Sequence, residues 1–169
     1  MSPRLILVGA PGSGKTTIGK LVANQLNLEF IDVDHEIEMD EKTTISDIFV
    51  KKGEDYFRDL EKKKISGLLN SFAGVLSLGG GSILDQITRD ALAIAPVVWL
   101  KVSPGEASSR VGMGLSRPVL MGNVRSNLVK LLEERTPLYA EVADWQIDTS
   151  GKSIEEVVQE VLLQTSEVN

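Results

Sequence analysis

The sequence of 169 residues contains no cysteine, one histidine and few aromatic residues, which make up 5% of the chain. Without cysteine there can be no disulfide and no thiolate metal site, which agrees with a protein of the reducing cytoplasm. Basic residues are in the minority, so the formal net charge is −6. This charge argues against a broad basic surface, and we expect no nucleic-acid partner.

Long hydrophobic runs are also missing. No stretch approaches the ~20 apolar residues that a membrane span needs, and no cationic start followed by an apolar signal stretch is present. Apolar residues form 42% and charged residues 25% of the chain, which is typical of a globular protein with a core. We expect one cytoplasmic domain over residues 1–169 that acts as a monomer and has no membrane partner.

Residues 9–16 read GAPGSGKT and contain every fixed position of the GxxxxGK[ST] phosphate loop. The apolar run at 5–8 is an expected strand, and residues 17–26 have the spacing of a helix. Glycines let backbone N–H groups turn toward an anion, and a helix N-terminus adds partial positive charge. A glycine-rich turn without function is the alternative, but the complete motif between strand and helix favours phosphate binding.

The side chains of this loop have separate expected roles. Lys15 can reach the outer phosphates of a nucleotide, and the Thr16 hydroxyl can ligate Mg²⁺ as cofactor. The loop residues expected to bind the nucleotide are Gly12, Ser13, Gly14, Lys15, Thr16 and Thr17.

Strands and helices alternate along the rest of the chain. Further strands are expected at 29–34, 75–78, 97–102 and 145–147, with helical patterns between them, one of them from about 85 to 95. Five apolar strands separated mostly by helices predict an α/β fold, a parallel sheet covered by helices on both faces. The segment from about 33 to 70 is too long for one crossover helix, so we expect a small subdomain beside the carboxyl ends of the strands.

Two helix starts have the sequence of a capping box, in which a serine and a glutamate bond to each other's backbone N–H groups. One is Ser103 with Glu106, and the other is Ser153 with Glu156. We expect a helix to begin at each of these pairs.

Three further patterns follow the phosphate loop in a fixed order. Residues 32–34 read DVD, residues 53–61 match GExxFRxxE, and residues 78–81 read LGGG. The first and last are weak alone, whereas the ordered set with the phosphate loop is specific. Together they resemble the shikimate kinase family over residues 5–161. The resemblance implies a P-loop fold of the nucleoside-monophosphate-kinase type and transfer of the ATP γ-phosphoryl group to the 3-hydroxyl of shikimate, in aromatic amino-acid biosynthesis.

Two acids follow the second expected strand. Asp34 lies near the phosphate loop, where it can accept a proton from a hydroxyl group or orient it, and the resemblance implies this role with shikimate. Asp32 would hold hydrated Mg²⁺ through water. The alternative is that both acids only cap the helix that begins near His35. His35 itself is expected to be solvated at the helix start.

Two arginines are expected to bind the substrate carboxylate, because guanidinium groups bind carboxylates with two parallel hydrogen bonds. Glu61 follows Arg58 by one turn and can hold it in place, or the two form only a surface pair of little effect. Arg135 lies in a segment that matches the R-x-P-L-Y motif of the family. Glycines 79–81 let the backbone approach a ligand, or form only a tight turn. The expected substrate-binding residues are Asp34, Arg58, Gly79, Gly80, Gly81 and Arg135, with Ile45, Phe49 and Phe57 as an apolar wall. Packing in the core would explain Ile45 and Phe49 equally well.

The resemblance also implies a mobile lid at about 112–124, a segment with three glycines and a proline. Arg117 would bring positive charge to the transferring phosphoryl group when the lid closes. Arg110 would pack on adenine and bind ATP, as would Ser153 beside the family's adenine loop at 148–150. The expected catalytic residues are Lys15, Asp34 and Arg117.

Three other functions stay open. A kinase for another polyol acid such as gluconate would share the phosphate loop, but Arg58, Glu61 and the triple glycine favour shikimate. A nucleotide-dependent switch without an acceptor is disfavoured by Asp34 and Arg117. A nucleic-acid-dependent ATPase is disfavoured by the acidic composition.

Overall fold

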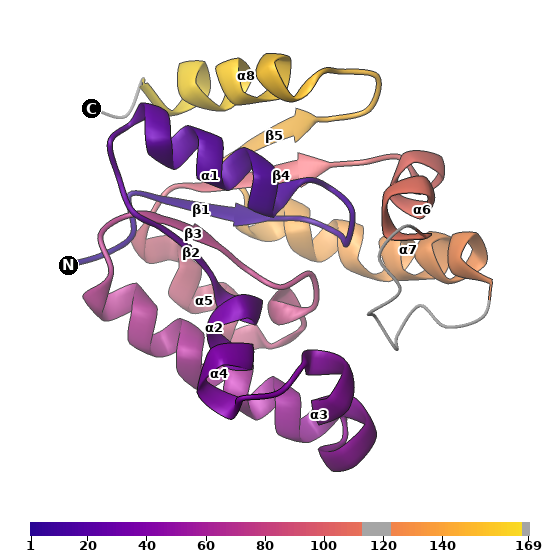
Figure 1. Cartoon of the computed structure of the whole chain (residues 1–169). Coiled ribbons are helices and arrows are strands. Elements are labelled where there is room, and N and C mark those ends of the chain that lie inside the picture. The colour runs from indigo at the N-terminus through magenta and orange to yellow at the C-terminus, as the bar shows by residue number, and fades with distance from the viewer. Residues whose placement is uncertain (113–122, 167–169) are drawn as a thin grey trace.

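The computed structural model describes residues 1–112 and 123–166. Its five strands form one parallel sheet in the order β2-β3-β1-β4-β5 (Figure 1). The strands are β1 (Leu5–Val8), β2 (Phe30–Asp32), β3 (Val75–Ser77), β4 (Val97–Lys101) and β5 (Trp145–Asp148). The predicted five-stranded parallel sheet is therefore confirmed. Residues 113–122, which include Arg117 and most of the predicted lid, lie outside the described residues.

Helices connect the strands. They are α1 (Lys15–Gln25), α2 (Val33–Glu41), α3 (Ile45–Lys52), α4 (Glu54–Ser71), α5 (Gln86–Ala91), α6 (Pro104–Gly112), α7 (Val124–Val142) and α8 (Ile154–Ser166), with 3-10 helices η1 (Ser82–Leu84) and η2 (Leu92–Ile94). Across residues 1–112 and 123–166, no helix is both long enough and apolar enough to cross a membrane.

The helix predicted from 85 to 95 is wrong in its second part. The Asp85 side chain accepts a hydrogen bond from Thr88 N and starts α5, but the chain continues as η2 after Ala91. Pro96 disfavours a helical conformation for the residue before it, and Ala95 is extended with φ −146° and ψ 159°. The helix therefore tightens and ends before the proline.

The side chains of β1 divide the core into two parts, because successive residues of a strand point to opposite faces of the sheet. Leu5 and Leu7 pack in a cluster with residues of α1 and α8. Ile6 and Val8 pack in the other cluster, with residues of α4 and α7. Figure 1 shows these helix pairs on opposite faces of the sheet. The predicted covering of both faces by helices is thereby confirmed.

The strand predicted at 29–34 is shorter, because Asp32 ends it. Asp32 Oδ1 accepts hydrogen bonds from Asp34 N at 3.0 Å and His35 N at 3.3 Å, which caps α2 and starts it at Val33. Asp32 pairs with Ser77 of β3, and Ser77 pairs with Leu7 of β1. The carboxyl ends of these three strands therefore lie side by side.

The segment between β2 and β3 folds into α2, α3 and α4. Thr44 caps α3 by accepting a hydrogen bond from Asp47 N, and Gly53, with φ +87°, separates α3 from α4. The rings of Phe49 and Phe57 lie 5.1 Å apart and join α3 to α4. That these helices form a subdomain of their own stays a prediction.

A pair of helical glycines tests the packing. A Cβ at Gly19 of α1 would press against the ring of Phe30, so Gly19→Ala should lower the free energy of unfolding by about 1–3 kcal/mol. Gly67 of α4 is exposed with nothing within 4 Å of an added Cβ, so Gly67→Ala should raise it by about 0.5–1 kcal/mol. Urea unfolding measures both, and effects of the same sign would contradict the described packing.

Candidate active site

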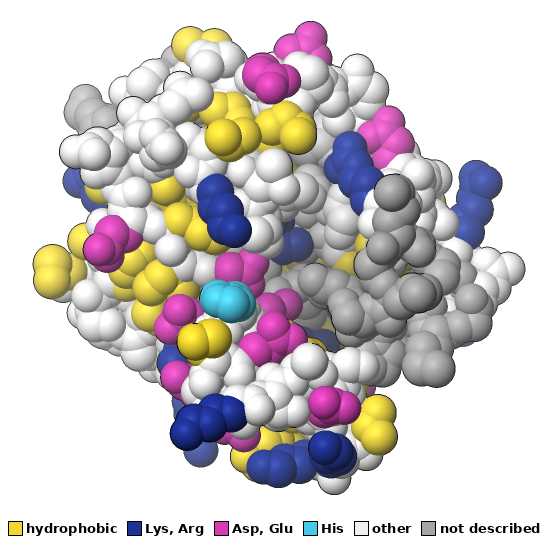
Figure 2. All heavy atoms as spheres, viewed as in Figure 1, with side chains coloured by type: hydrophobic (Ala, Val, Ile, Leu, Met, Phe, Trp, Pro, Cys, Tyr) yellow, Lys and Arg dark blue, Asp and Glu magenta, His cyan; other side chains and the backbone are white. Residues whose placement is uncertain are grey.

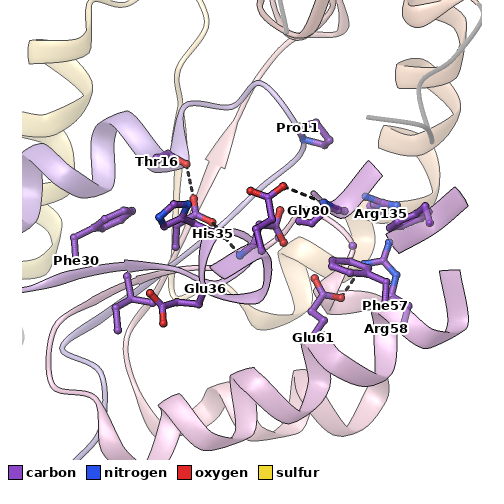
Figure 3. Close-up of a pocket in the computed structure, with 18 of the residues that line it drawn as sticks. Pro11, Thr16, Phe30, His35, Glu36, Phe57, Arg58, Glu61, Gly80 and Arg135 are labelled. Atoms are coloured by element: carbon purple, nitrogen blue, oxygen red, sulfur yellow. Dashed lines mark hydrogen bonds and ion pairs between the residues drawn. The ribbon is translucent and has the colours of Figure 1, made fainter. Parts of the chain in front are cut away.

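Two cavities open near the carboxyl ends of β1, β2 and β3. The larger cavity, about 570 Å³, is lined by residues of α2, α3, α4 and α7 and by the glycines at 79–81 (Figure 3). The smaller cavity, about 180 Å³, is lined by residues of the phosphate loop, by Thr17, by the acids Asp32 and Asp34 and by residues 78–80. Five residues line both cavities: Thr16, Asp32, Asp34, Gly79 and Gly80. The two spaces therefore share one wall.

The phosphate loop turns sharply between β1 and α1. Gly12 and Gly14 have φ values of +79° and +91°, which only glycine adopts without strain. Lys15 Nζ donates hydrogen bonds to Gly9 O at 2.7 Å and to Ala10 O at 3.1 Å. The ammonium group thus lies against the carbonyls of its own loop, at the start of α1 where an anion is favoured. Thr17 also lines the smaller cavity.

Thr16 and Asp32 bring two oxygen atoms together beside the loop. Thr16 Oγ1 donates to Asp32 Oδ2 at 2.6 Å, while Oδ1 of Asp32 caps α2. The cap that was the alternative for Asp32 is thus real, but it uses only one carboxylate oxygen. Among the described residues, no group of three or more His, Cys, Asp or Glu could hold a metal ion. Hydroxyl and carboxylate oxygens fit Mg²⁺, which needs only one or two protein ligands when phosphate supplies others.

A group of buried charged side chains occupies one end of the larger cavity. Arg58 Nη1 donates to Glu61 Oε2 at 2.8 Å, and its Nη2 donates to Glu54 Oε1 at 3.3 Å. Figure 3 shows Arg135 of α7 reaching the same end from another helix. The Arg58 side chain is 23% exposed and that of Glu61 is 3% exposed, so this pair is more than the surface pair of the alternative. Arg135 is 7% exposed.

Two of the glycines at 79–81 face charged side chains without room for a side chain of their own, and the third, Gly80, faces Pro11 of the phosphate loop. A Cβ at Gly79 would lie 2.6 Å from Asp34 Oδ1 and 2.7 Å from Glu61 Oε1. A Cβ at Gly81 would clash with the guanidinium group of Arg58. The segment is therefore more than a tight turn, because its backbone forms part of the cavity wall.

Tyr139 connects α7 to these glycines. Its hydroxyl donates to Gly80 O at 2.5 Å, and its ring lies 5.7 Å from the ring of Trp99 in the core. No role is assigned to Tyr139 from the sequence, although it is the tyrosine of the R-x-P-L-Y segment that begins at Arg135. The motif and the spacing of one helical turn, which places both residues on one face of α7, were the available signals for a shared function.

Burial raises the pKa of Glu61 from 4.5 to about 7. Arg58 and Arg135 oppose this rise, and Asp34 adds to it. Burial alone would lower the pKa of Arg58, but the charges of Glu61 and Glu54 outweigh it and the pKa is raised. Arg58 therefore stays a cation, whereas Glu61 titrates near neutral pH.

The other end of the larger cavity is acidic. His35 is exposed at the start of α2, as predicted, and Figure 2 shows acidic side chains around it on this face. Ile45, Phe49 and Phe57 also line the larger cavity and supply apolar surface to it.

The residues predicted to bind adenine lie near the phosphate loop and at the start of α8. Arg110 Nη1 donates to Gly12 O at 2.9 Å. Ser153 Oγ accepts from Glu156 N at 3.1 Å, and Ser153 N donates to Glu156 Oε2 at 2.7 Å. The Ser153 hydroxyl thus caps α8, and its role toward a nucleotide stays a prediction.

The raised pKa of Glu61 predicts that stability falls as pH rises from about 4.5 to 7. Over this range the native protein binds more protons than the unfolded chain, so the free energy of unfolding decreases, by about 3 kcal/mol at most. Urea unfolding across this range without ligands compares the parent with Glu61→Gln. The free energy of unfolding of the parent minus that of the variant should decrease as pH rises, because glutamine does not titrate. A constant difference across the range would contradict the assignment.

Comparison with known proteins identifies one family. Residues 11–166 match the family model described as shikimate kinase. A shikimate kinase of Salinispora tropica is 47% identical over 161 residues, covering 95% of this chain and 96% of that protein. The structure of shikimate kinase from Acinetobacter baumannii in complex with shikimate has a TM-score of 0.94 at 36% identity, covering 100% of this chain and 95% of that one.

A gluconokinase from Sinorhizobium meliloti has a TM-score of 0.59 at 18% identity, covering 99% of this chain and 93% of that one. At this identity the likeness concerns the fold alone and does not support the gluconate alternative. The family model and the relatives, by contrast, extend over nearly the whole sequence. This chain therefore belongs to the shikimate kinase family.

Proposed function

We propose that the larger cavity binds shikimate and the smaller cavity binds the phosphates of ATP, so that the γ-phosphoryl group passes to the 3-hydroxyl of shikimate. The products are shikimate 3-phosphate and ADP. The single observation that carries this proposal is the shared wall, because Asp34 borders both spaces. Membership of the family supports the same reaction, and the relative from Acinetobacter baumannii is described in complex with shikimate.

Arg58 and Arg135 bind the shikimate carboxylate in this proposal. Both guanidinium groups are planar forks with several N–H donors, and a carboxylate between them gains charge-assisted hydrogen bonds. Glu61 holds Arg58 from behind through its 2.8 Å bond. Phe49 and Phe57 pack against the ring, which has no charge of its own. Helices α2 to α4 then act as the acceptor-binding subdomain.

Asp34 orients the 3-hydroxyl and accepts its proton as the bond to phosphorus forms. A carboxylate at the border of the two cavities lies on the path between the acceptor oxygen and the phosphoryl group. Gly79 and Gly81 keep this border free of side chains, and Gly80 completes the backbone wall. Positioning of the two substrates is the main contribution that such a site makes to phosphoryl transfer.

The phosphate loop binds the nucleotide through its backbone N–H groups at residues 12–17. Lys15 exchanges the carbonyls of Gly9 and Ala10 for phosphate oxygens, where its charge stabilises the transferring group. Thr16 would ligate Mg²⁺ directly and Asp32 would hold it through water, and the ion supplies neutralising charge to the phosphate oxygens. Arg110 and Ser153 contact the adenine base of the nucleotide in this proposal.

A coupled assay of ADP release with a panel of hydroxylated carboxylic acids tests the function. Shikimate should be phosphorylated, gluconate should not, and Lys15→Met should lower kcat by about 10²–10³-fold by removing charge from the transition state. Circular dichroism should show that this variant is folded. ADP release that does not depend on any acceptor would support a nucleotide switch instead.

Exchange of single side chains separates binding from chemistry. Asp34→Asn keeps the size of the side chain but cannot take a proton, so kcat should fall about 10²–10⁴-fold while the KM for ATP changes little. Arg58→Ala and Arg135→Ala should raise the KM for shikimate about 10–100-fold. Lys130→Ala, an exposed residue of α7, is the control. Normal shikimate binding by both arginine variants would remove the basis for the carboxylate site.

A further inference from the structure

Glu106 of α6 lies between the phosphate loop and a segment that we call the base loop, residues 148–153. Its Oε1 accepts a hydrogen bond from Gly151 N at 2.8 Å, and its Oε2 accepts one from Arg110 Nη2 at 3.0 Å. Arg110 Nη1 donates in turn to Gly12 O at 2.9 Å. One carboxylate thus connects the base loop to the phosphate loop through a single arginine.

The predicted capping box of Ser103 and Glu106 is only half formed. Glu106 N donates to Ser103 Oγ at 3.3 Å, but Ser103 N donates to Ser150 Oγ at 2.9 Å instead of to the glutamate. At α8, by contrast, Ser153 and Glu156 form both bonds of the box. The predicted helix start is confirmed, because α6 begins directly after Ser103. The reciprocal bond is missing because the carboxylate of Glu106 accepts from Gly151 N, and Ser150 Oγ accepts from Ser103 N in its place.

The two segments that Glu106 connects are each held independently. A Cβ at Gly12 would lie 3.0 Å from Ala107 O, so α6 packs directly on the phosphate loop. The base loop is fixed to the end of β4, because Thr149 N and Oγ1 donate to Lys101 O at 2.9 and 2.6 Å. A carboxylate that spans two fixed segments has a defined position, and so does the arginine it binds.

We propose that Glu106 is a positioning residue for the purine base of the nucleotide. It holds the planar guanidinium group of Arg110 in an orientation suited to stacking on the base, and it holds the Gly151 turn at the opposite side. This inference rests on the proposed binding of ATP phosphates at the phosphate loop. The ion pair of Glu106 with Arg110 joins two exposed side chains one helical turn apart, and such a pair contributes little to the free energy of folding. The role of Glu106 is therefore to fix the position of Arg110.

Calorimetric titration with ADP and with pyrophosphate tests this role, because both carry phosphates but only ADP carries a base. Glu106→Ala should weaken ADP binding about tenfold and pyrophosphate binding less than about twofold. Glu106→Gln keeps an oxygen that can accept from Gly151 N but loses the charge toward Arg110, so its ADP affinity should lie between those of the parent and the alanine variant. This variant decides the question if Glu106→Ala does not fold.

Glu141→Ala is the matched control. Glu141 is 47% exposed, compared with 38% for Glu106, and it pairs with Arg89 Nε at 3.2 Å while lining neither cavity. Both affinities should be unchanged in this variant. Equal losses for ADP and pyrophosphate in the Glu106 variants, or no loss for either, would overturn the proposal. Failure of the parent protein to bind pyrophosphate would instead contradict the assignment of the smaller cavity to phosphates.

Discussion

All five strands run in the same direction, and this constraint decides where the chemistry can occur. In a parallel sheet every strand delivers its following residues to one edge. The pairing of Ser77 with both Leu7 and Asp32 aligns the ends of three strands there. The phosphate loop, the acids after β2 and the glycines after β3 therefore meet, although they are far apart along the chain. Helices α4 and α7 need only add charge from the sides.

The buried charges of the site lower the free energy of unfolding of the protein without ligands. Arg58 and Arg135 line the same cavity, and Glu61, the carboxylate that Arg58 binds, is itself almost fully buried. Its raised pKa reflects this conflict, because burial disfavours the same charge that the arginines favour. The carboxylate of an acid substrate would add the negative charge that Glu61 supplies incompletely. The charge arrangement that would favour binding of an acid substrate is therefore the same one that raises the pKa of Glu61.

Short motifs made much of this site predictable. The phosphate loop and the Arg58–Glu61 pair each lie within a few residues whose spacing determines a turn or a helix face, and the apolar strands determine the sheet. Contacts between distant segments were not predictable. Local spacing indicates a cap for Glu106, and nothing in it indicates Gly151 as its partner. Tyr139 is a similar case, because its acceptor, Gly80, belongs to another element.

The border at Asp34 has a consequence for inhibitors. A single molecule that joins a cyclic carboxylic acid to a polyphosphate would fill both cavities if its linker passed beside Asp34 and the backbone of Gly80. Linking two ligands raises the effective concentration of the second, so two groups that each bind weakly can form a molecule that binds tightly. Selectivity would come from the acid part, because phosphate loops occur in many proteins whereas the paired guanidinium groups of Arg58 and Arg135 belong to this cavity. On this side the linker would meet the backbone of Gly79 and Gly80, because an added Cβ at either glycine would collide with neighbouring atoms of the protein.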